Sequence, residues 1–179
     1  MSAEKVLIIV DMQKDFVDGA LGTKEAAAIL PGVEEKARTF PGRLIFTLDT
    51  HTADYLETSE GKNLPVVHCV KDTPGWRLAG QLEEIAREKN AEVIEKPTFG
   101  SVALAERLRE EYEAGKLSSI ELLGLCTDIC VVSNALLLKA FMPELPITVD
   151  AALCAGVTPE KHEAALETMQ SCQIMVTGA

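Results

Sequence analysis

Four apolar runs of this 179-residue sequence end in side chains that can take part in catalysis or bind a metal. Asp11 follows the first run, Asp49 and His51 follow the second, Lys96 follows the third, and Cys130 follows the fourth. If these runs are parallel strands, their carboxyl ends meet at one edge of a sheet, where open α/β folds bind their ligands. The sequence therefore predicts one active site built from residues far apart in the chain.

Cys130 is the candidate nucleophile. It closes the segment Thr-Asp-Ile-Cys, in which Thr127 or Asp128 can cap the helix that begins there. The thiol would lie in the first helical turn, where free N–H groups and the helix dipole favour a thiolate and could also hold an oxyanion. The alternative is a packing cysteine, because a reduced cysteine is among the most buried residue types.

Two charged residues at strand ends favour the catalytic interpretation of Cys130. An unpaired carboxylate at Asp11, directly after a buried strand, would have a raised pKa, which suits a base. Lys96 precedes Pro97, which keeps the chain extended and could aim the ammonium inward. A nucleophile, a base and an electrostatic helper together fit covalent catalysis. A salt bridge between Asp11 and Lys96 at the sheet edge is the alternative.

Asp49, His51 and His68 form a candidate metal site. In an extended segment, residues two apart point the same way, so Asp49 and His51 can bind one ion while His68 closes over it. Two histidines and a carboxylate leave coordination positions open, which is typical of a catalytic ion, with zinc expected first and iron or manganese as alternatives. Glu60 is a further candidate ligand. Because Asp-x-His also occurs by chance, a purely structural role is the alternative.

Strands and helices that could position these residues alternate along the chain. Continuous apolar runs, typical of strands buried on both faces, occur at residues 6–10, 44–48, 91–94, 119–125 and 147–149, with a weaker one at 173–176. Helical patterns lie between them at residues 31–39, 82–89, 102–114, 129–141 and 159–170. This alternation predicts an α/β fold, a doubly wound parallel sheet with helices on both faces.

Length and composition restrict the fold and the function further. With 47% hydrophobic residues, the chain can form one domain over residues 1–179 with a core of its own. A net charge of -11 offers no basic surface for nucleic acid or an anionic membrane. The run before Asp11 is too short for a signal peptide or a membrane span, and five scattered cysteines form no disulfide framework. We expect a cytoplasmic protein with reduced thiols.

Three more residues lie near the candidate site. Phe16 and Phe99 could wall a pocket for a flat substrate, although core packing would place them equally well. Cys126 precedes Cys130 by four residues, a spacing that could support a redox pair but differs from the usual two-residue-spaced motif.

The sequence resembles the isochorismatase-like cysteine hydrolase superfamily and, within it, the nicotinamidases. The resemblance covers nearly the whole chain and rests on IVDMQKDF (9–16), DTH (49–51), HCV (68–70), TPG (73–75), Lys96 and GLCTDICV (124–131). It implies a three-layer α/β/α fold with a six-stranded parallel sheet, and the triad Asp11, Lys96 and Cys130. It also implies a cis peptide before Cys126 and an oxyanion hole formed by the N–H groups of Cys126 and Cys130.

The same resemblance implies a function. The metal ligands would be Asp49, His51 and His68, and in some relatives a glutamate in the position of Glu60 assists. Isochorismatases proper lack the nucleophilic cysteine and carbamoyl-sarcosine amidases lack the metal motif, so having both favours a nicotinamidase. We expect a metal-containing cysteine amidohydrolase that converts a small primary carboxamide, nicotinamide first, to the acid and ammonia through a thioester. Relatives often form dimers or tetramers, so a homo-oligomer is expected.

Departures from the nicotinamidase pattern keep two alternatives open. The segment 52–64 is shorter than in many nicotinamidases, and Leu-Pro-Val-Val rather than aromatic residues precedes His68, which predicts a less aromatic pocket. One alternative is an amidase for another small amide or a ureido compound such as N-carbamoyl-sarcosine or ureidoacrylate. The other is a metal-binding or thiol redox protein without enzymatic activity.

Overall fold

The computed structural model of the protein describes residues 3–179. Six parallel strands in this part of the chain form a sheet with the order β3-β2-β1-β4-β5-β6. The strands are β1 (Glu4–Val10), β2 (Arg43–Asp49), β3 (Glu92–Lys96), β4 (Leu117–Leu125), β5 (Ile147–Ala155) and β6 (Met175–Thr177). The predicted α/β fold with a six-stranded parallel sheet is therefore confirmed.

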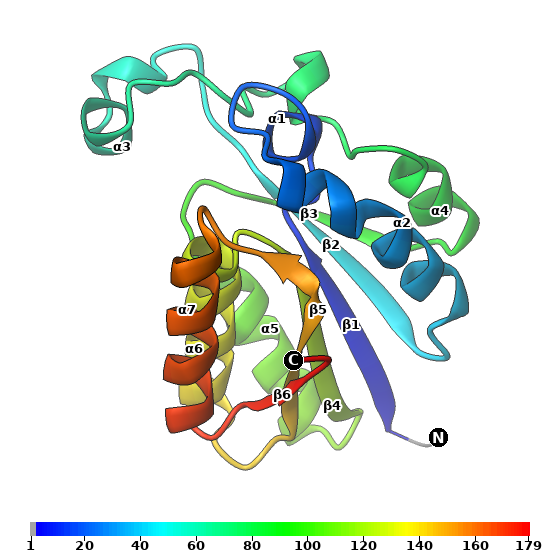
Figure 1. Cartoon of the computed structure of the whole chain (residues 1–179). Helices are drawn as coiled ribbons and strands as arrows, with labels where there is room; N and C mark the ends of the chain where they lie inside the picture. Colours follow the sequence, from blue (N-terminus) through cyan, green and yellow to red (C-terminus); the bar gives the residue numbers. More distant parts are fainter. Residues whose placement is uncertain (1–2) are drawn as a thin grey trace.

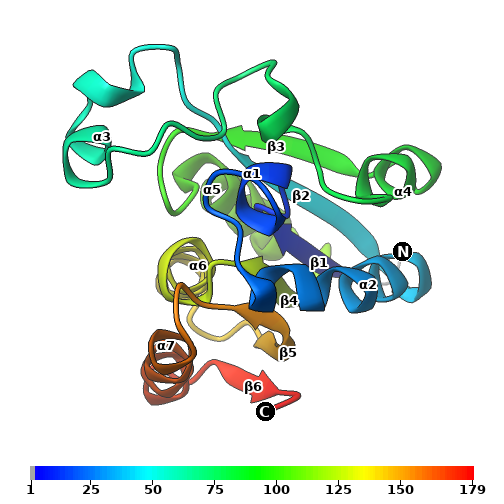
Figure 2. The ribbon, with the colours of Figure 1, turned by 45° about the horizontal axis from the view of Figure 1, so that its top comes forward.

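Helices cover both faces of the sheet, as Figures 1 and 2 show. On one face lie α2 (Lys24–Thr39) and α4 (Leu82–Glu88), and on the other lie α5 (Val102–Glu113), α6 (Val132–Phe141) and α7 (Pro159–Ser171). Because both faces are covered, the central strands β1 and β2 are buried almost from end to end. This burial explains why their sequences are continuously apolar instead of alternating.

Helix α2 begins well before residue 31, where the sequence pattern placed its start. Thr23 caps it, with Oγ1 accepting the Ala26 N–H at 3.0 Å. Pro31 lies inside the helix on its exposed side, although an internal proline costs about 3 kcal/mol. The opposite side of α2 buries Ala26 and Val33 against the sheet, which offsets that cost.

Strand β5 also runs beyond its predicted end at residue 149, as far as Ala155. The predicted strand ended at residue 149 because the charged Asp150 interrupts the apolar run. In the structure its carboxylate lies 3.7 Å from the ammonium of Lys36 on α2, so the strand accommodates the charge and continues.

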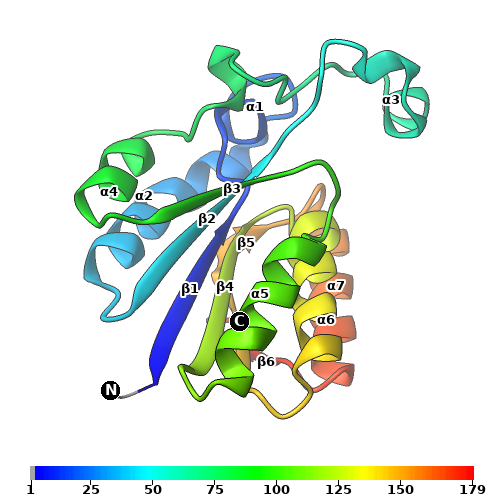
Figure 3. The same cartoon turned by 180° about the vertical axis from the view of Figure 1, so that it is seen from behind.

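The chain between β2 and β3 forms much of the structure above the carboxyl ends of the strands. It contains the 3-10 turns η1 (Tyr55–Glu57) and η2 (Pro74–Trp76) and the helix α3 (Ser59–Asn63), which projects from the body of the molecule in Figures 1 and 3. The short helix α1 (Lys14–Val17) lies at the same end. Within residues 3–179, no helix is both long and apolar enough to cross a membrane.

Candidate active site

The strand register brings the ends of four strands together. Val10, the last residue of β1, pairs with β2 on one side and with Gly124 of β4 on the other, so Asp11 emerges between them. Asp49 at the end of β2 pairs with Lys96 at the end of β3. Gly124 is required here because its φ is +121° and a Cβ atom would lie 2.2 Å from the Val10 carbonyl oxygen.

Cys130 is carried by the turn that connects β4 to α6. A cis peptide joins Leu125 to Cys126, as the family resemblance implied, and a π-helical turn, η3 (Thr127–Val131), follows. Two later N–H groups of this turn donate to the Cys126 carbonyl at 3.1 Å. Within the described chain, the N–H groups of Cys126 and Cys130 donate to no group outside the turn, which leaves them available to an oxyanion.

Thr127 and Asp128 do not cap the following helix, contrary to the prediction. The Thr127 hydroxyl lies 2.7 Å from Nδ1 of His162 on α7, and Asp128 Oδ1 accepts the Val157 N–H at 2.9 Å. Because a π-helical turn precedes α6, these side chains point toward α7 and the loop before it instead of toward the N–H groups of their own helix. Both contacts fix the turn that carries Cys130.

Lys96 connects Asp11 to Cys130. Its ammonium lies 2.6 Å from Asp11 Oδ2 and 3.3 Å from Cys130 Sγ, and Lys96 as a whole is only 1% exposed. The ammonium also donates to the Thr98 carbonyl at 3.1 Å, so its three N–H donors face three partners. The structure thus gathers the three residues of the expected triad into one buried cluster.

Asp11 combines an unusual backbone conformation with a carboxylate that has a partner at each oxygen. Its φ of +48° lies in the left-handed region, which is uncommon for a residue other than glycine and is often found at functional sites. Thr47 Oγ1 accepts the Asp11 N–H at 3.2 Å and donates to Oδ1 at 2.6 Å. Oδ2 accepts from the Lys96 ammonium at 2.6 Å. A carboxylate oxygen has two lone pairs, so Oδ2 can still take up a proton on the other one.

Burial governs the protonation of this cluster. Burial raises the pKa of Asp11, and the nearby Lys96 ammonium opposes that rise. Burial lowers the pKa of Lys96, but the Asp11 carboxylate outweighs it and raises the pKa of Lys96 above its usual value, so the lysine is charged at neutral pH. Burial first and Asp11 second raise the pKa of Cys130 well above its usual value, against the effect of Lys96.

The prediction that the site favours a Cys130 thiolate is therefore wrong for the resting protein. Cys130 is only 4% exposed, and the loss of water around its sulfur outweighs the nearby ammonium and the helical turn. A neutral thiol needs a base in contact with it before it can attack a substrate. Asp11, which shares the Lys96 ammonium with Cys130, is the candidate for that base.

Asp49, His51, Glu60 and His68 form a second cluster next to the first. One donor atom from each of the four lies within 4.8 Å of all the others. Nε2 of His51 is 3.0 Å from Asp49 Oδ2 and 3.6 Å from Glu60 Oε1, and Nε2 of His68 is 3.4 Å and 3.7 Å from the same oxygens. A tetrahedral ion with bonds of about 2.1 Å spaces its ligand atoms about 3.4 Å apart. The four donors therefore fit a single ion, and Glu60 belongs to the set.

The charges of this second cluster also suit a cation. Burial raises the pKa of Asp49, but hydrogen bonds with His51 and His68 outweigh it and hold the pKa below its usual range. Burial and the charge of Asp49 raise the pKa of Glu60. His68 Nδ1 lies 2.7 Å from the Val66 carbonyl oxygen, and an N–H donated there leaves the lone pair of Nε2 free for an ion.

Residues that the sequence analysis gave no role hold these ligands in place. Gln13 Nε2 donates to the Asp49 carbonyl at 2.9 Å, and its Oε1 accepts the Asp49 N–H at 2.8 Å. The ring of Tyr55 packs edge-on against His51 and His68, with centroids 4.7 Å and 5.0 Å apart. Gln13 could have been noticed as a polar residue at the end of a buried strand. No sequence pattern indicated a role for Tyr55, because its position depends on the path of an irregular segment.

Asn134 is another residue that the sequence analysis did not consider. Its Nδ2 donates to the carbonyls of Cys130 at 2.8 Å and Phe99 at 3.1 Å, and its Oδ1 accepts the Ser101 N–H at 2.9 Å. It lies one helical turn after Cys130, a spacing that puts the two residues on the same side of a helix. Asn134 thereby joins the turn that carries Cys130 to the segment that follows Lys96.

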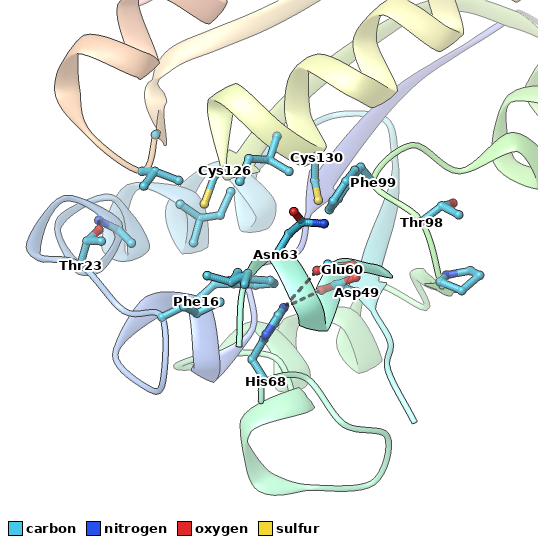
Figure 4. A pocket seen from close by; sticks show the side chains of 18 of the residues that line it. Phe16, Thr23, Asp49, Glu60, Asn63, His68, Thr98, Phe99, Cys126 and Cys130 are labelled. Carbon is cyan, nitrogen blue, oxygen red and sulfur yellow. Dashed lines mark hydrogen bonds and ion pairs between the residues drawn. The ribbon is translucent and has the colours of Figure 1, made fainter. Parts of the chain in front are cut away.

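Both clusters open into one cavity of about 650 Å³. Figure 4 shows Cys130 facing the group formed by Asp49, Glu60 and His68 across this space. Phe16 and Phe99 both line the cavity, and their contact with a substrate stays a prediction. The Phe16 ring lies against His68, with centroids 5.4 Å apart, whereas Phe99 is largely exposed.

Comparison with known proteins shows which family has this sequence and fold. The sequence profile of the isochorismatase domain matches residues 5–179. The isochorismatase family protein PncA of Bacillus subtilis strain 168 is 28% identical over 176 residues, which cover 91% of this chain and 92% of that protein. The crystal structure of nicotinamidase/pyrazinamidase PncA from Bacillus subtilis superposes with a TM-score of 0.82 at 29% identity, covering 97% of this chain and 98% of that one.

Pyrazinamidase of Pyrococcus horikoshii, solved in complex with zinc, gives a TM-score of 0.80 at 29% identity and covers 98% of this chain and 99% of that one. The family match spans nearly the whole chain, and both structural matches are nicotinamidases or pyrazinamidases. The chain therefore belongs to the isochorismatase family and is a hydrolase with the fold of the nicotinamidases.

Proposed function

We propose that the protein is a metal-containing cysteine amidohydrolase that converts a small neutral carboxamide, most readily nicotinamide, to the acid and ammonia. The observation that carries this proposal is the position of the Lys96 ammonium, 2.6 Å from Asp11 Oδ2 and 3.3 Å from Cys130 Sγ in a buried cluster. That arrangement places a base and a cation beside a sulfur that faces a cavity. The likeness to structures of nicotinamidases at 29% identity supports the same reaction class.

The arrangement accounts for each step of amide hydrolysis. Asp11 Oδ2 takes the Cys130 proton as the sulfur attacks the carboxamide carbon, and the N–H groups of Cys126 and Cys130 hold the oxyanion. Asp11 then passes the proton to the leaving nitrogen, and ammonia departs from the thioester. A water molecule, deprotonated by Asp11, attacks the thioester and regenerates the thiol. Lys96 remains charged throughout and balances the carboxylate and the developing negative charge on sulfur.

The metal would be held by Asp49, His51 and His68, with Glu60 as a fourth ligand. Their donor spacing fits zinc, and the zinc complex of the Pyrococcus horikoshii pyrazinamidase supports this choice over iron or manganese. An ion bound there would supply a Lewis-acid anchor for a lone pair of the substrate, such as that of a pyridine nitrogen, because zinc can accept a further ligand beyond four.

The cavity lining favours a neutral substrate over an anionic one. Among the described residues that line it there is no lysine or arginine, whereas two carboxylates, Asp49 and Glu60, face the interior. N-carbamoyl-sarcosine and ureidoacrylate both carry a carboxylate, and away from the proposed metal ion no cationic side chain of the described chain lines the cavity to pair with it. The ureido alternative is therefore less well supported than a neutral carboxamide.

The thiol redox alternative is also less well supported. Burial raises the pKa of Cys126 to about 12, and burial raises the pKa of Cys130 as well. Thiols with raised pKa values are poor nucleophiles in disulfide exchange. All five cysteines of the chain are free in the structure, which supports our further proposal that the enzyme acts in the reducing cytoplasm.

A substrate panel tests the proposed reaction. Ammonia release is measured with nicotinamide, pyrazinamide, N-carbamoyl-sarcosine and ureidoacrylate at equal concentration. The two neutral carboxamides are expected to be hydrolysed, and the two anionic compounds at least about tenfold more slowly. Faster release from either ureido compound would reverse the substrate assignment.

Loss of the metal ligands should weaken substrate binding as well as turnover. Purified protein is expected to hold about one zinc per chain, and His51→Ala or His68→Ala should abolish stoichiometric binding, because each removes one of four donors. His162→Ala is the matched control, since His162 lies outside the donor cluster. Elemental analysis gives the metal content, and nicotinamide titration gives the affinity. Equal zinc content in wild type and both ligand variants would contradict the site.

Gln13→Met is expected to lower zinc affinity without removing a ligand. The side chain keeps its length but loses both hydrogen bonds to the Asp49 backbone, and supporting residues of this kind contribute about 10-fold to 100-fold in affinity. Competition with a chromophoric chelator measures the change. An unchanged affinity would mean that Gln13 only stabilises the fold.

We further propose that this single catalytic domain assembles as a homo-oligomer. Exposed apolar side chains gather on the segment around α3, at Leu56, Leu64 and Val67. Exposed apolar groups in one region are typical of an interaction surface. Light scattering of the purified protein gives the assembly state, and replacing these three residues by serine should shift it toward the monomer.

A further inference from the structure

We propose that the active-site cavity has a second, apolar lobe that binds a substituent carried by the substrate beyond its carboxamide ring. The preferred substrates would then be neutral primary carboxamides with an apolar extension, and nicotinamide would be the smallest member of the class. This inference rests on the proposed amidase function and adds a substrate class to it.

The size of the cavity exceeds what nicotinamide needs. Nicotinamide has about nine non-hydrogen atoms, and at roughly 30 Å³ each, the space of a water molecule in the liquid, it takes up less than about 270 Å³. The cavity holds about 650 Å³, within the range of sites that enclose larger ligands. More than half of the space therefore lies beyond a bound nicotinamide.

This additional space extends away from the reacting groups. In Figure 4 Cys130 and the facing group of Asp49 and Glu60 lie at one end of the view, whereas Thr23 lies on the far side of Cys126. The walls at that end, which we call the distal lobe, come from the start of α2 and from the loop between β5 and α7. We assign to the distal lobe the cavity-lining residues of these two segments, Leu21, Thr23, Ala26, Gly156 and Val157.

The distal lobe offers apolar surface and no charge. Its one hydroxyl, Thr23 Oγ1, already accepts the Ala26 N–H as the cap of α2. Val157 is held by its N–H bond to Asp128, so this wall is fixed to the turn that carries the nucleophile. Each methylene buried against such a surface strengthens binding about fourfold. Because Val157 is 44% exposed, the lobe reaches the surface and can accommodate a longer chain.

Carbon 5 of the pyridine ring is the position from which a substituent would enter the distal lobe. The carboxamide is on carbon 3, and carbon 2 lies between carbon 3 and the ring nitrogen. Carbon 5 is directly across the ring from carbon 2, so a substituent on it points away from both the metal cluster and Cys130. The experiment compares nicotinamide with its 5-methyl, 5-ethyl and 5-propyl derivatives. The readout is kcat/KM for each, from ammonia release.

Variants of the lobe wall complete the design. Val157→Trp narrows the distal lobe from the loop side, and Leu21→Trp, at a half-buried lining position before α2, narrows it from the other wall if the first variant does not fold. Val93→Trp is the matched control, because Val93 is also 44% exposed and lies on β3 outside this cavity. Thermal melts establish that each variant is folded.

The inference predicts that kcat/KM rises about fourfold for each added methylene. It also predicts that the ratio of 5-propylnicotinamide to nicotinamide falls by at least about tenfold in Val157→Trp and stays unchanged in Val93→Trp. If nicotinamide is hydrolysed but the 5-alkyl derivatives react no faster, the distal lobe is refuted and the amidase function stands. If no carboxamide is hydrolysed, the proposed function fails and the inference fails with it.

Discussion

Cys130→Ala is expected to lower ammonia release from nicotinamide by at least about 10⁴-fold while the protein stays folded. Loss of a nucleophile removes the covalent route entirely, and comparable changes in other hydrolases cost this much or more. The substitution deletes one sulfur atom, and the Lys96 ammonium keeps its contacts with Asp11 and the Thr98 carbonyl. Initial rates and a thermal melt are measured on the same preparations.

The chain offers a closely matched control for this prediction. Cys154 is also a free, buried cysteine, 5% exposed against 4% for Cys130, but it lies in β5 and outside the cavity lining. Cys154→Ala should therefore keep nearly the full rate. Residual activity of Cys130→Ala above about one hundredth of wild type would rule out the thioester route.

Breaking the buried ion pair from one side should destabilise the protein, and removing both charges should restore much of the loss. Asp11→Asn leaves the Lys96 ammonium without its carboxylate, and Lys96→Met leaves the Asp11 carboxylate without its ammonium; both groups are almost fully buried. An uncompensated buried charge costs about 3 to 5 kcal/mol. For a chain of this size that lowers Tm by roughly 6 to 20 °C.

The double variant separates stability from catalysis. Asn tolerates the left-handed backbone of residue 11, and in Asp11→Asn/Lys96→Met no charge is left unpaired, so at least about half of the lost stability should return. Activity should remain at least about 10²-fold below wild type in all three variants, because the base is absent or mispaired. Thermal melts and initial rates give both quantities. A double variant less stable than either single variant would refute the ion-pair account.

Most of the fold can be predicted from sequence pattern because its central strands are buried on both faces. Continuous apolar runs mark β1, β2 and β4, and a charged residue at the end of such a run locates the carboxyl edge of the sheet. Sequence pattern therefore assigns Asp11, Asp49 and Lys96 to one edge, and the register between the strands brings them together.

Other features depend on tertiary contacts that leave little trace in sequence. The predicted start of α2 is wrong because Pro31 suggests a first turn, whereas the packing of Ala26 and Val33 overrides that preference. The role of Thr47 depends on strand register, since it meets Asp11 only across two neighbouring strands.

The protonation state of Cys130 could not be predicted from the sequence pattern either, for a related reason. Its position near the start of a helix and beside a lysine favours a thiolate, but the pKa depends first on burial, which a sequence pattern does not reveal. The raised pKa of Cys130 makes the predicted role of Asp11 as a base more important, because the thiolate is not already formed.

The most direct test of the central claim, a thioester on Cys130, is partitioning with hydroxylamine. Nicotinamide and methyl nicotinate are each turned over in the presence of hydroxylamine, and the ratio of hydroxamate to acid is measured. Because both substrates would form the same acyl-enzyme after ammonia or methanol leaves, the account predicts equal ratios at every hydroxylamine concentration. Ratios that differ between the two substrates, or acid without any hydroxamate, would contradict a shared thioester intermediate.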